Sequence, residues 1–237
     1  RVSHVTKPAV STPETQHPRL VPRTALLLPM VVHRVTTRGE VQTMNGENVP
    51  KHGASFGVGS LPHRERREAV EFAWRATDIP TIPSLPRRSP AEGMIAQALV
   101  GIEGVSAGQY GSISVDIDAL DLAGEVTTDL QSDAYGGFAG FLESASLQHE
   151  KPGYVKWQFV GPLTLGFSLV RSGMAVEVAA PLAMQAVRCH VRALQAEVAA
   201  ILPHTTQIVV FDEPMLHEAL VPRSEEHTSE LQSRETI

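Results

Sequence analysis

Three apolar segments of the chain end in residues whose types could bind a small polar ligand. They read GVGSLP at 57–62 with His63 after it, FVGPLTLG at 159–166 and FDEPMLHE at 211–218. Glycine lets a ligand approach the backbone, hydroxyl and amide groups can hold a carboxylate, and an acidic side chain can hold an ammonium group. Asp212 and Glu213 give the strongest signal, because two acids at the end of a buried strand need partners. A structural ion pair is the alternative to a ligand there, and His63 is a weaker candidate beside the first motif.

The elements that must position these segments alternate between strands and helices. We expect strands at 55–60, 79–85, 112–118, 155–160 and 207–211, and helices at 64–77, 90–99, 128–147 and 176–202. Ser89 and Pro90 are typical of a helix N-terminus, and Pro181 interrupts the pattern of the last helix. Strands separated by such helices pair in parallel through right-handed crossovers, which predicts an α/β fold, either a doubly wound sheet or a barrel. In a barrel, the carboxyl ends of the strands lie on one face, where the three motifs would meet.

The three motifs, in this order, resemble the C-terminal catalytic barrel of cobalamin-independent methionine synthase, in the uroporphyrinogen decarboxylase/methionine synthase-like superfamily. The resemblance covers residues 55–218, with 80–156 matched poorly. It implies that residues 44–222 are the N-terminal part of an incomplete (β/α)8 TIM-type barrel, with about five of the eight strands. It also implies a parent methyltransferase that moves a methyl group from 5-methyltetrahydrofolate to homocysteine to give methionine.

The resemblance assigns roles to four residues of this chain. Gly59 and Ser60 would hold the carboxylate end of the amino acid, Asp212 would hold its ammonium group, and Glu218 would lie on the pterin side. The His-Gly-Glu segment with which the family also binds the amino group has no counterpart here. No catalytic residue is identified.

Zinc is expected for the full-length family member, where it deprotonates and activates the homocysteine thiol. The family's zinc ligands are a His-x-Cys pair, a glutamate and a distant cysteine, all downstream of the Asp-Glu-Pro segment. We therefore expect no zinc in this chain. Cys189 and His190 are neighbours in a predicted helix, where side chains about 100° apart do not converge on one ion. Cys189 is interpreted as a small apolar side chain of the core.

Three alternatives to this function remain open. A uroporphyrinogen decarboxylase-like barrel needs no metal and uses an aspartate near the first strand, where this chain offers Ser60 and His63. A corrinoid-linked, zinc-dependent methyltransferase is the second alternative. The third is a truncated reading frame without activity, and we expect the chain to be inactive on its own.

Composition limits the class of protein and its partners. The chain has 237 residues, 42% apolar and 19% charged, which is typical of a globular protein. The single cysteine excludes an intramolecular disulfide and indicates a reducing compartment, so we expect a cytoplasmic protein. The net charge of −6 and the lack of a basic patch with aromatic residues argue against nucleic acid, and no apolar run is long enough for a membrane span.

The two ends of the chain differ from its middle. Residues 1–43 are basic and lack periodicity, and we interpret them as a non-native or disordered lead before a start at Met44, with a transit peptide as the alternative. Residues 223–233 resemble the in-frame translation of a sequencing adapter, so 223–237 is interpreted as an adapter-derived tail. Arg87 and Arg88 follow a proline and are interpreted as a solvent-exposed turn, with a grip on folate carboxylates as the alternative.

Overall fold

The computed structural model describes residues 34–35, 41–42, 49–108, 111–121 and 124–220. Two short strands of the predicted lead, β1 (Arg34–Val35) and β2 (Val41–Gln42), pair antiparallel. The rest of the lead and the whole predicted tail at 223–237 lie outside the described residues.

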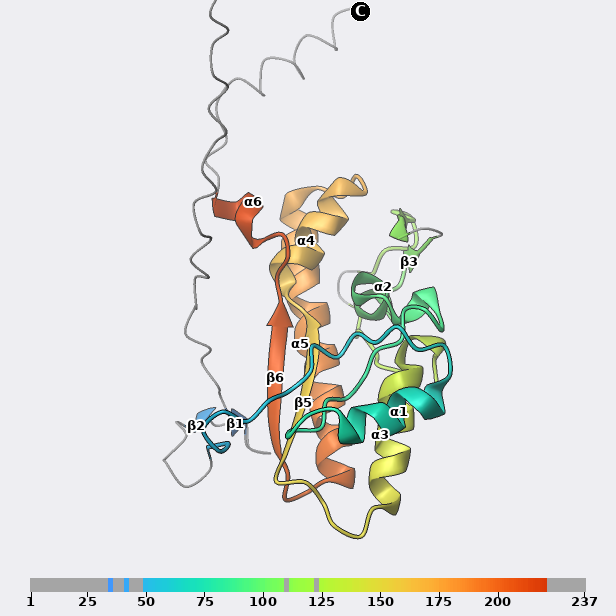
Figure 1. The fold of residues 1–237 in the computed structure, drawn as a ribbon. Helices are drawn as coiled ribbons and strands as arrows, with labels where there is room; N and C mark the ends of the chain where they lie inside the picture. The colour runs from blue at the N-terminus through green and yellow to red at the C-terminus, as the bar shows by residue number, and fades with distance from the viewer. Residues whose placement is uncertain (1–33, 36–40, 43–48, 109–110, 122–123, 221–237) are drawn as a thin grey trace, which may run out of the picture. The chain divides into compact units, whose positions relative to one another are not determined.

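Parallel pairing dominates the larger sheet. Strand β5 (Tyr154–Val160) pairs with β6 (Thr206–Asp212) along the full length of both (Figure 1). Isolated parallel bridges add the segment 79–85 beside β5 and the segment 55–61 beside 79–85. The four segments therefore lie side by side in chain order. The predicted α/β class is confirmed, in that the described residues form a mixed α/β fold.

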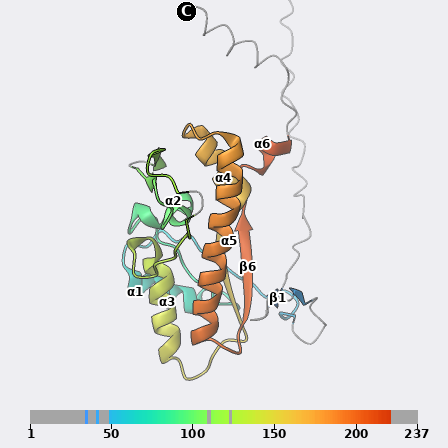
Figure 2. The same ribbon diagram turned by 180° about the vertical axis from the view of Figure 1, so that it is seen from behind.

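The helices of the described residues are α1 (Arg66–Arg75), α2 (Met94–Leu99), α3 (Gly136–Leu147), α4 (Pro162–Arg171), α5 (Val176–Ile201) and α6 (Leu216–Leu220). Helices α2, α3 and α5 contact β5, α1 packs against α3, and α6 follows the end of β6 (Figure 1). Two turns of 3₁₀ helix, Pro90–Glu92 and Asp133–Tyr135, precede α2 and α3. The long helix α5 runs along the two strands, as the opposite views in Figures 1 and 2 both show. No helix in the described part of the chain combines the length and the apolar character needed to cross a bilayer.

Side chains of β5 alternate between the helical layer and the opposite face of the sheet, because successive residues of a strand point to opposite sides. Trp157 meets Phe138 of α3 edge-on, with ring centroids 5.8 Å apart, and Phe159 lies 5.7 Å from His190 of α5. Lys156 therefore points to the face away from these helices. The apolar core lies between the sheet and the helices, and a polar side chain occupies the other face.

The strand predicted at 112–118 forms in part, but it lies outside the parallel series. Strand β4 (Ile113–Val115) pairs antiparallel with β3 (Val105–Ala107). The connection between them is too short for a helical crossover, so a hairpin is the geometry that it permits. Gly104 begins this hairpin with φ of 76°.

The helix predicted at 128–147 starts later in the structure, and the interruption expected at Pro181 in the helix at 176–202 does not occur. The side chain of Asp129 accepts a hydrogen bond from the amide of Gln131, at 2.8 Å. Such a local turn competes with the helix, so α3 begins at Gly136 rather than at 128. Helix α5 continues through Pro181 without a break. Proline near the start of a long helix removes a single backbone hydrogen bond there, and packing along the sheet offsets the loss.

Glycines let the first half of α3 lie directly against its neighbours. A Cβ atom at Gly137 would lie 2.6 Å from the carbonyl oxygen of Pro83, and one at Gly140 would lie 2.7 Å from Cδ of Arg66. The contact with the Pro83 backbone leaves no room for a side chain at Gly137, whereas at Gly140 the exposed side chain of Arg66 would have to move. Helix α3 therefore packs closely against the 83–92 segment and α1.

Candidate functional site

The carboxyl ends of the parallel segments meet at one edge of the sheet. Ser60 faces Ser84 in a parallel bridge, and Val160 pairs with Asp212 at the ends of β5 and β6. The bridge between the 79–85 segment and β5 brings Ser84 close to the level of Val160. The structure thus places Ser60 and Asp212, which are far apart in the sequence, at the same edge.

Gly59 lies in close contact with β5. Its φ is +112°, in the region that favours glycine, and a Cβ atom there would lie 3.2 Å from Oε1 of Gln158. Its carbonyl oxygen accepts a hydrogen bond from the amide of Ser84, and the amide of Leu61 donates to the carbonyl oxygen of Ser84, each at 3.0 Å. These bonds fix the backbone on both sides of Ser60.

Lys156 lies under this turn, on the sheet face away from the helices. Its Nζ donates hydrogen bonds to the carbonyl oxygen of Val58 and, at 2.6 Å, to Oε1 of Gln158. The ring centroid of Phe56 lies 5.9 Å from Nζ. Lys156 is only 2% exposed, and burial lowers its pKa to about 8, against the attraction of Asp212. The ammonium group is still mostly charged at neutral pH.

Asp212 is the acidic side chain that acts electrostatically on Lys156. It is partly buried, and burial raises the pKa of its carboxyl group, whereas Lys156 acts to lower it. The two side chains form no ion pair, which leaves a cation and an anion apart on the same face of the sheet. Such an arrangement can bind a small molecule that carries both charges.

Glu213 and Glu218 point to different partners from those expected. The Glu213 carboxylate accepts hydrogen bonds from the amides of Leu163 at 3.0 Å and Thr164 at 2.7 Å, so it caps the N-terminus of α4. The Glu218 carboxylate binds Nη2 of Arg171 through both oxygens, each at 2.7 Å. Both acids thus already have partners within the protein.

His63 follows the first motif but makes no described hydrogen bond at the strand edge. Its ring lies 5.3 Å from that of Phe72 on α1, at an interplanar angle of 41°. Nδ1 is buried and has no hydrogen-bond partner among the described residues. These contacts place His63 between the first motif and α1.

No group of three His, Cys, Asp or Glu side chains within the described ranges could hold a metal ion. Cys189 packs partly buried against the core, and His190 next to it is fully buried. Nδ1 of His190 lies 2.8 Å from Oγ1 of Thr128 and 3.3 Å from the hydroxyl of Tyr135. These residues do not fit a zinc site, and the expectation that this chain binds no zinc stays a prediction.

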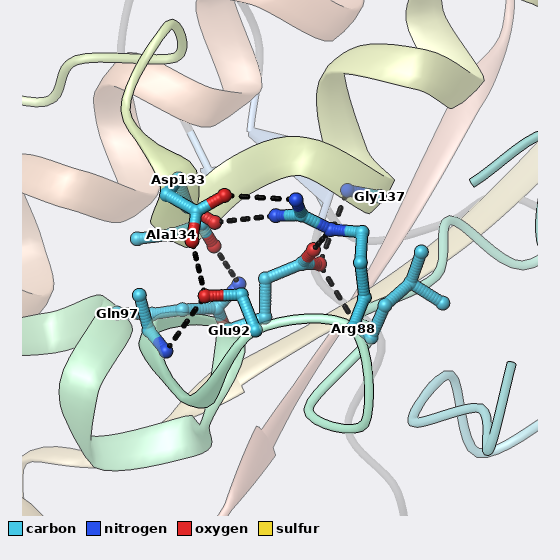
Figure 3. Close-up of polar contacts among 9 residues, drawn as sticks. Arg88, Glu92, Gln97, Asp133, Ala134 and Gly137 are labelled. Carbon is cyan, nitrogen blue, oxygen red and sulfur yellow. Dashed lines mark hydrogen bonds and ion pairs between the residues drawn. The ribbon is translucent and has the colours of Figure 1, made fainter. Parts of the chain in front are cut away.

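A separate polar cluster, buried at Glu92 and exposed at Asp133, joins the segment before α2 to the start of α3 (Figure 3). Glu92 is 1% exposed, and its carboxylate accepts hydrogen bonds from Nε of Arg88 at 2.5 Å and from the amides of Leu85 and Gly137. Arg88 also binds Asp133, at 2.8 Å. The predicted turn is present and is exposed at Arg87, but Arg88 is only partly exposed, because Glu92 and Asp133 bind its guanidinium group.

Sequence reasoning missed Lys156 and Gln158. The signal was present, because a lysine in the middle of the apolar strand VKWQFV must be buried or must interrupt the sheet. Val58, whose carbonyl oxygen accepts its hydrogen bond, is 98 residues away in the sequence, so this contact could not be predicted from the sequence.

The fold and the site define a mixed α/β protein with a buried lysine and a partly buried aspartate, not in ion-pair contact, on one face of the parallel strands. Comparison of the chain with protein-family models, with curated proteins and with solved structures finds no match. The function is therefore inferred from the site and from the motifs.

Proposed function

We propose that residues 44–222 form the N-terminal part of a methionine synthase-like TIM barrel. The parent enzyme would transfer a methyl group from 5-methyltetrahydrofolate to homocysteine, with zinc as its metal. Two observations support this proposal. The three motifs follow one another in the order of the family, and two of the segments that carry them, 55–61 and β6, belong to the same series of parallel segments.

The observation that carries the proposal is the position of Ser60 and Asp212 at one edge of the sheet. An α-amino acid has a carboxylate and an ammonium group on one carbon atom. The hydroxyl and backbone amide of Ser60 can donate hydrogen bonds to the carboxylate, and the Asp212 carboxylate can accept them from the ammonium group. The two residues therefore offer the kinds of donor and acceptor that the two charged groups of an α-amino acid need, from the first and the last of the four parallel segments.

Binding of the amino acid is the part of the reaction that this chain's residues can perform. The described residues offer no fitting set of zinc ligands, so activation of the thiol is not assigned to any of them. Glu218 is proposed for the pterin side, where release from Arg171 would free its carboxylate for a ligand. We expect the chain to bind homocysteine without transferring the methyl group.

Titration calorimetry of the full chain with L-homocysteine tests the proposal. We expect binding by the wild type and about tenfold or greater weakening in Asp212→Asn, because the ammonium group loses a charged acceptor. Glu143→Gln is the matched control, since Glu143 is an exposed acid on α3. Absence of binding, or equal affinity in Asp212→Asn and the wild type, would contradict the proposal.

A further inference from the structure

Lys156 is a buried cation whose charge the protein does not fully balance. An ammonium group has three N–H donors, and the described residues supply two acceptors, Val58 and Gln158. Neither acceptor is charged, and no ion pair of Lys156 occurs in the part of the chain that the structure describes. Buried charges in proteins are paired as a rule, because leaving them unpaired is costly.

The position of Lys156 indicates what would pair with it. Its Nζ binds the carbonyl oxygen of the residue before Gly59 and the side chain of Gln158, against which Gly59 packs. The ammonium group thus lies below the backbone of Val58 and Gly59, one residue before Ser60. Asp212 lies on the same sheet face at the end of β6, because its pairing partner Val160 is in phase with Lys156 along β5.

We propose that Lys156 binds the carboxylate of a small ligand seated beside Gly59 and Ser60. The carboxylate would accept a hydrogen bond from the third N–H of Lys156 and would balance the buried charge. The adjacent backbone would donate further hydrogen bonds to the carboxylate. Asp212 would then face the positively charged end of the same ligand. This inference deepens the proposed function, on which it rests only for the identity of the ligand as homocysteine.

The proposal predicts that the affinity for a carboxylate ligand depends on pH, because the charge of Lys156 depends on pH. With a pKa of about 8, the ammonium group is charged at pH 7 and largely neutral at pH 9.5. The groups facing Nζ from the neighbouring strands are the Val58 carbonyl and the ring of Phe56, and Asp212 is the charged group that acts on it. Affinity for a carboxylate should therefore fall as pH rises through about 8.

The probe for this test is 4-(methylthio)butanoate, which has no amine or thiol that titrates between pH 7 and pH 9.5. Calorimetry on the wild type should show affinity about tenfold lower at pH 9.5 than at pH 7. The neutral amide of the same acid should bind at least about tenfold more weakly than the acid at pH 7. A pH-independent affinity, or equal binding of acid and amide, would overturn the inference without any substitution.

Two variants separate the charge from the packing. Lys156→Met should weaken binding of the acid at pH 7 by about 10-fold to 100-fold, and its residual binding should not depend on pH. Lys156→Arg keeps the charge to high pH, so binding should persist at pH 9.5. Circular dichroism spectra checked against the wild type identify any variant that has not folded, in which case the wild-type pH profile decides.

The outcomes also distinguish the inference from the proposed function. If L-homocysteine binds equally well to the wild type and to Lys156→Met, the inference fails and the proposed function stands. If the acid binds in a Lys156-dependent way while L-homocysteine does not bind, the inference stands and the proposed function fails. If neither compound binds, both are wrong.

Discussion

The carboxylate of Glu213 accepts a hydrogen bond of 2.7 Å from the backbone amide of Thr164, which joins the end of β6 to the first turn of α4. The amide of Leu163 donates to the same carboxylate. These amides belong to the first helical turn, where no carbonyl of the helix is available to them. An acid there also interacts favourably with the helix dipole. Glu213 thus anchors the helix that follows β5.

Removing this cap should destabilise the fold. We expect Glu213→Ala to lower the free energy of unfolding by about 1 to 3 kcal/mol, because two partly buried amides lose their acceptor. Urea denaturation followed by circular dichroism measures the change. Glu143→Ala, on an exposed position of α3, should stay within about 0.5 kcal/mol of the wild type. Equal stability of the two variants would show that the cap contributes nothing.

Gly161 is required by the same carboxylate. A Cβ atom at this position would overlap the side chain of Glu213. We expect Gly161→Ala to lower the free energy of unfolding by about 1 to 3 kcal/mol, because the added methyl group displaces the carboxylate from its amides. In the background of Glu213→Ala the cost should be smaller. A double-mutant cycle measures the coupling, and strictly additive costs would contradict this explanation.

The pair of Arg88 and Glu92 should be far more important for stability than an exposed pair. We expect Glu92→Ala to lower the free energy of unfolding by about 3 to 5 kcal/mol, since it leaves Arg88 and two amides without their buried partner. Glu71→Ala is the control, because its pairs with Arg67 and Arg75 lie on the exposed side of α1 and should contribute less than about 1 kcal/mol. Comparable losses in urea denaturation would refute the distinction.

His190 should make stability depend on pH. Burial lowers its pKa from 6.5 to about 4, so the unfolded chain takes up a proton at a higher pH than the folded one. The stabilisation is therefore complete above pH 6.5 and is lost as pH falls towards 4, at up to about 1.4 kcal/mol per pH unit. Urea denaturation at pH 7, 6 and 5 should show a flatter dependence for His190→Gln than for the wild type. His204→Gln, at an exposed position, should retain the wild-type slope.

Structural features that depend on residues close together in the sequence could be predicted from it. The apolar segments 155–160 and 207–211 predict β5 and β6, and the structure confirms both. Ser89 was predicted as a cap, and its hydroxyl accepts a hydrogen bond from the amide of Ala91 at 3.2 Å. Pro90 then occupies the first position of the 3₁₀ turn. In these cases the physical cause lies within a few residues of its effect.

Contacts between distant segments could not be predicted in the same way. Glu213 was a candidate for ligand binding because acids at strand ends are costly, but its partners belong to α4, 49 and 50 residues earlier. The hydrogen bonds of Lys156 with Val58 and the ion pair of Arg88 with Asp133 depend likewise on which segments the fold brings together. The sequence identified which polar groups need partners, and only the three-dimensional arrangement decides between protein and ligand.

The close packing of Gly137 and Gly140 has a consequence for the order of folding. Glycine weakens a helix by about 1 kcal/mol per residue relative to alanine, so α3 has little tendency to form alone. Its first half gains stability from contacts with Pro83 and with Arg66 of α1, and these segments must already be in place. Helix α3 should therefore form late, with φ-values near zero in the folding transition state. Helix α5, rich in alanine and free of glycine, should form earlier.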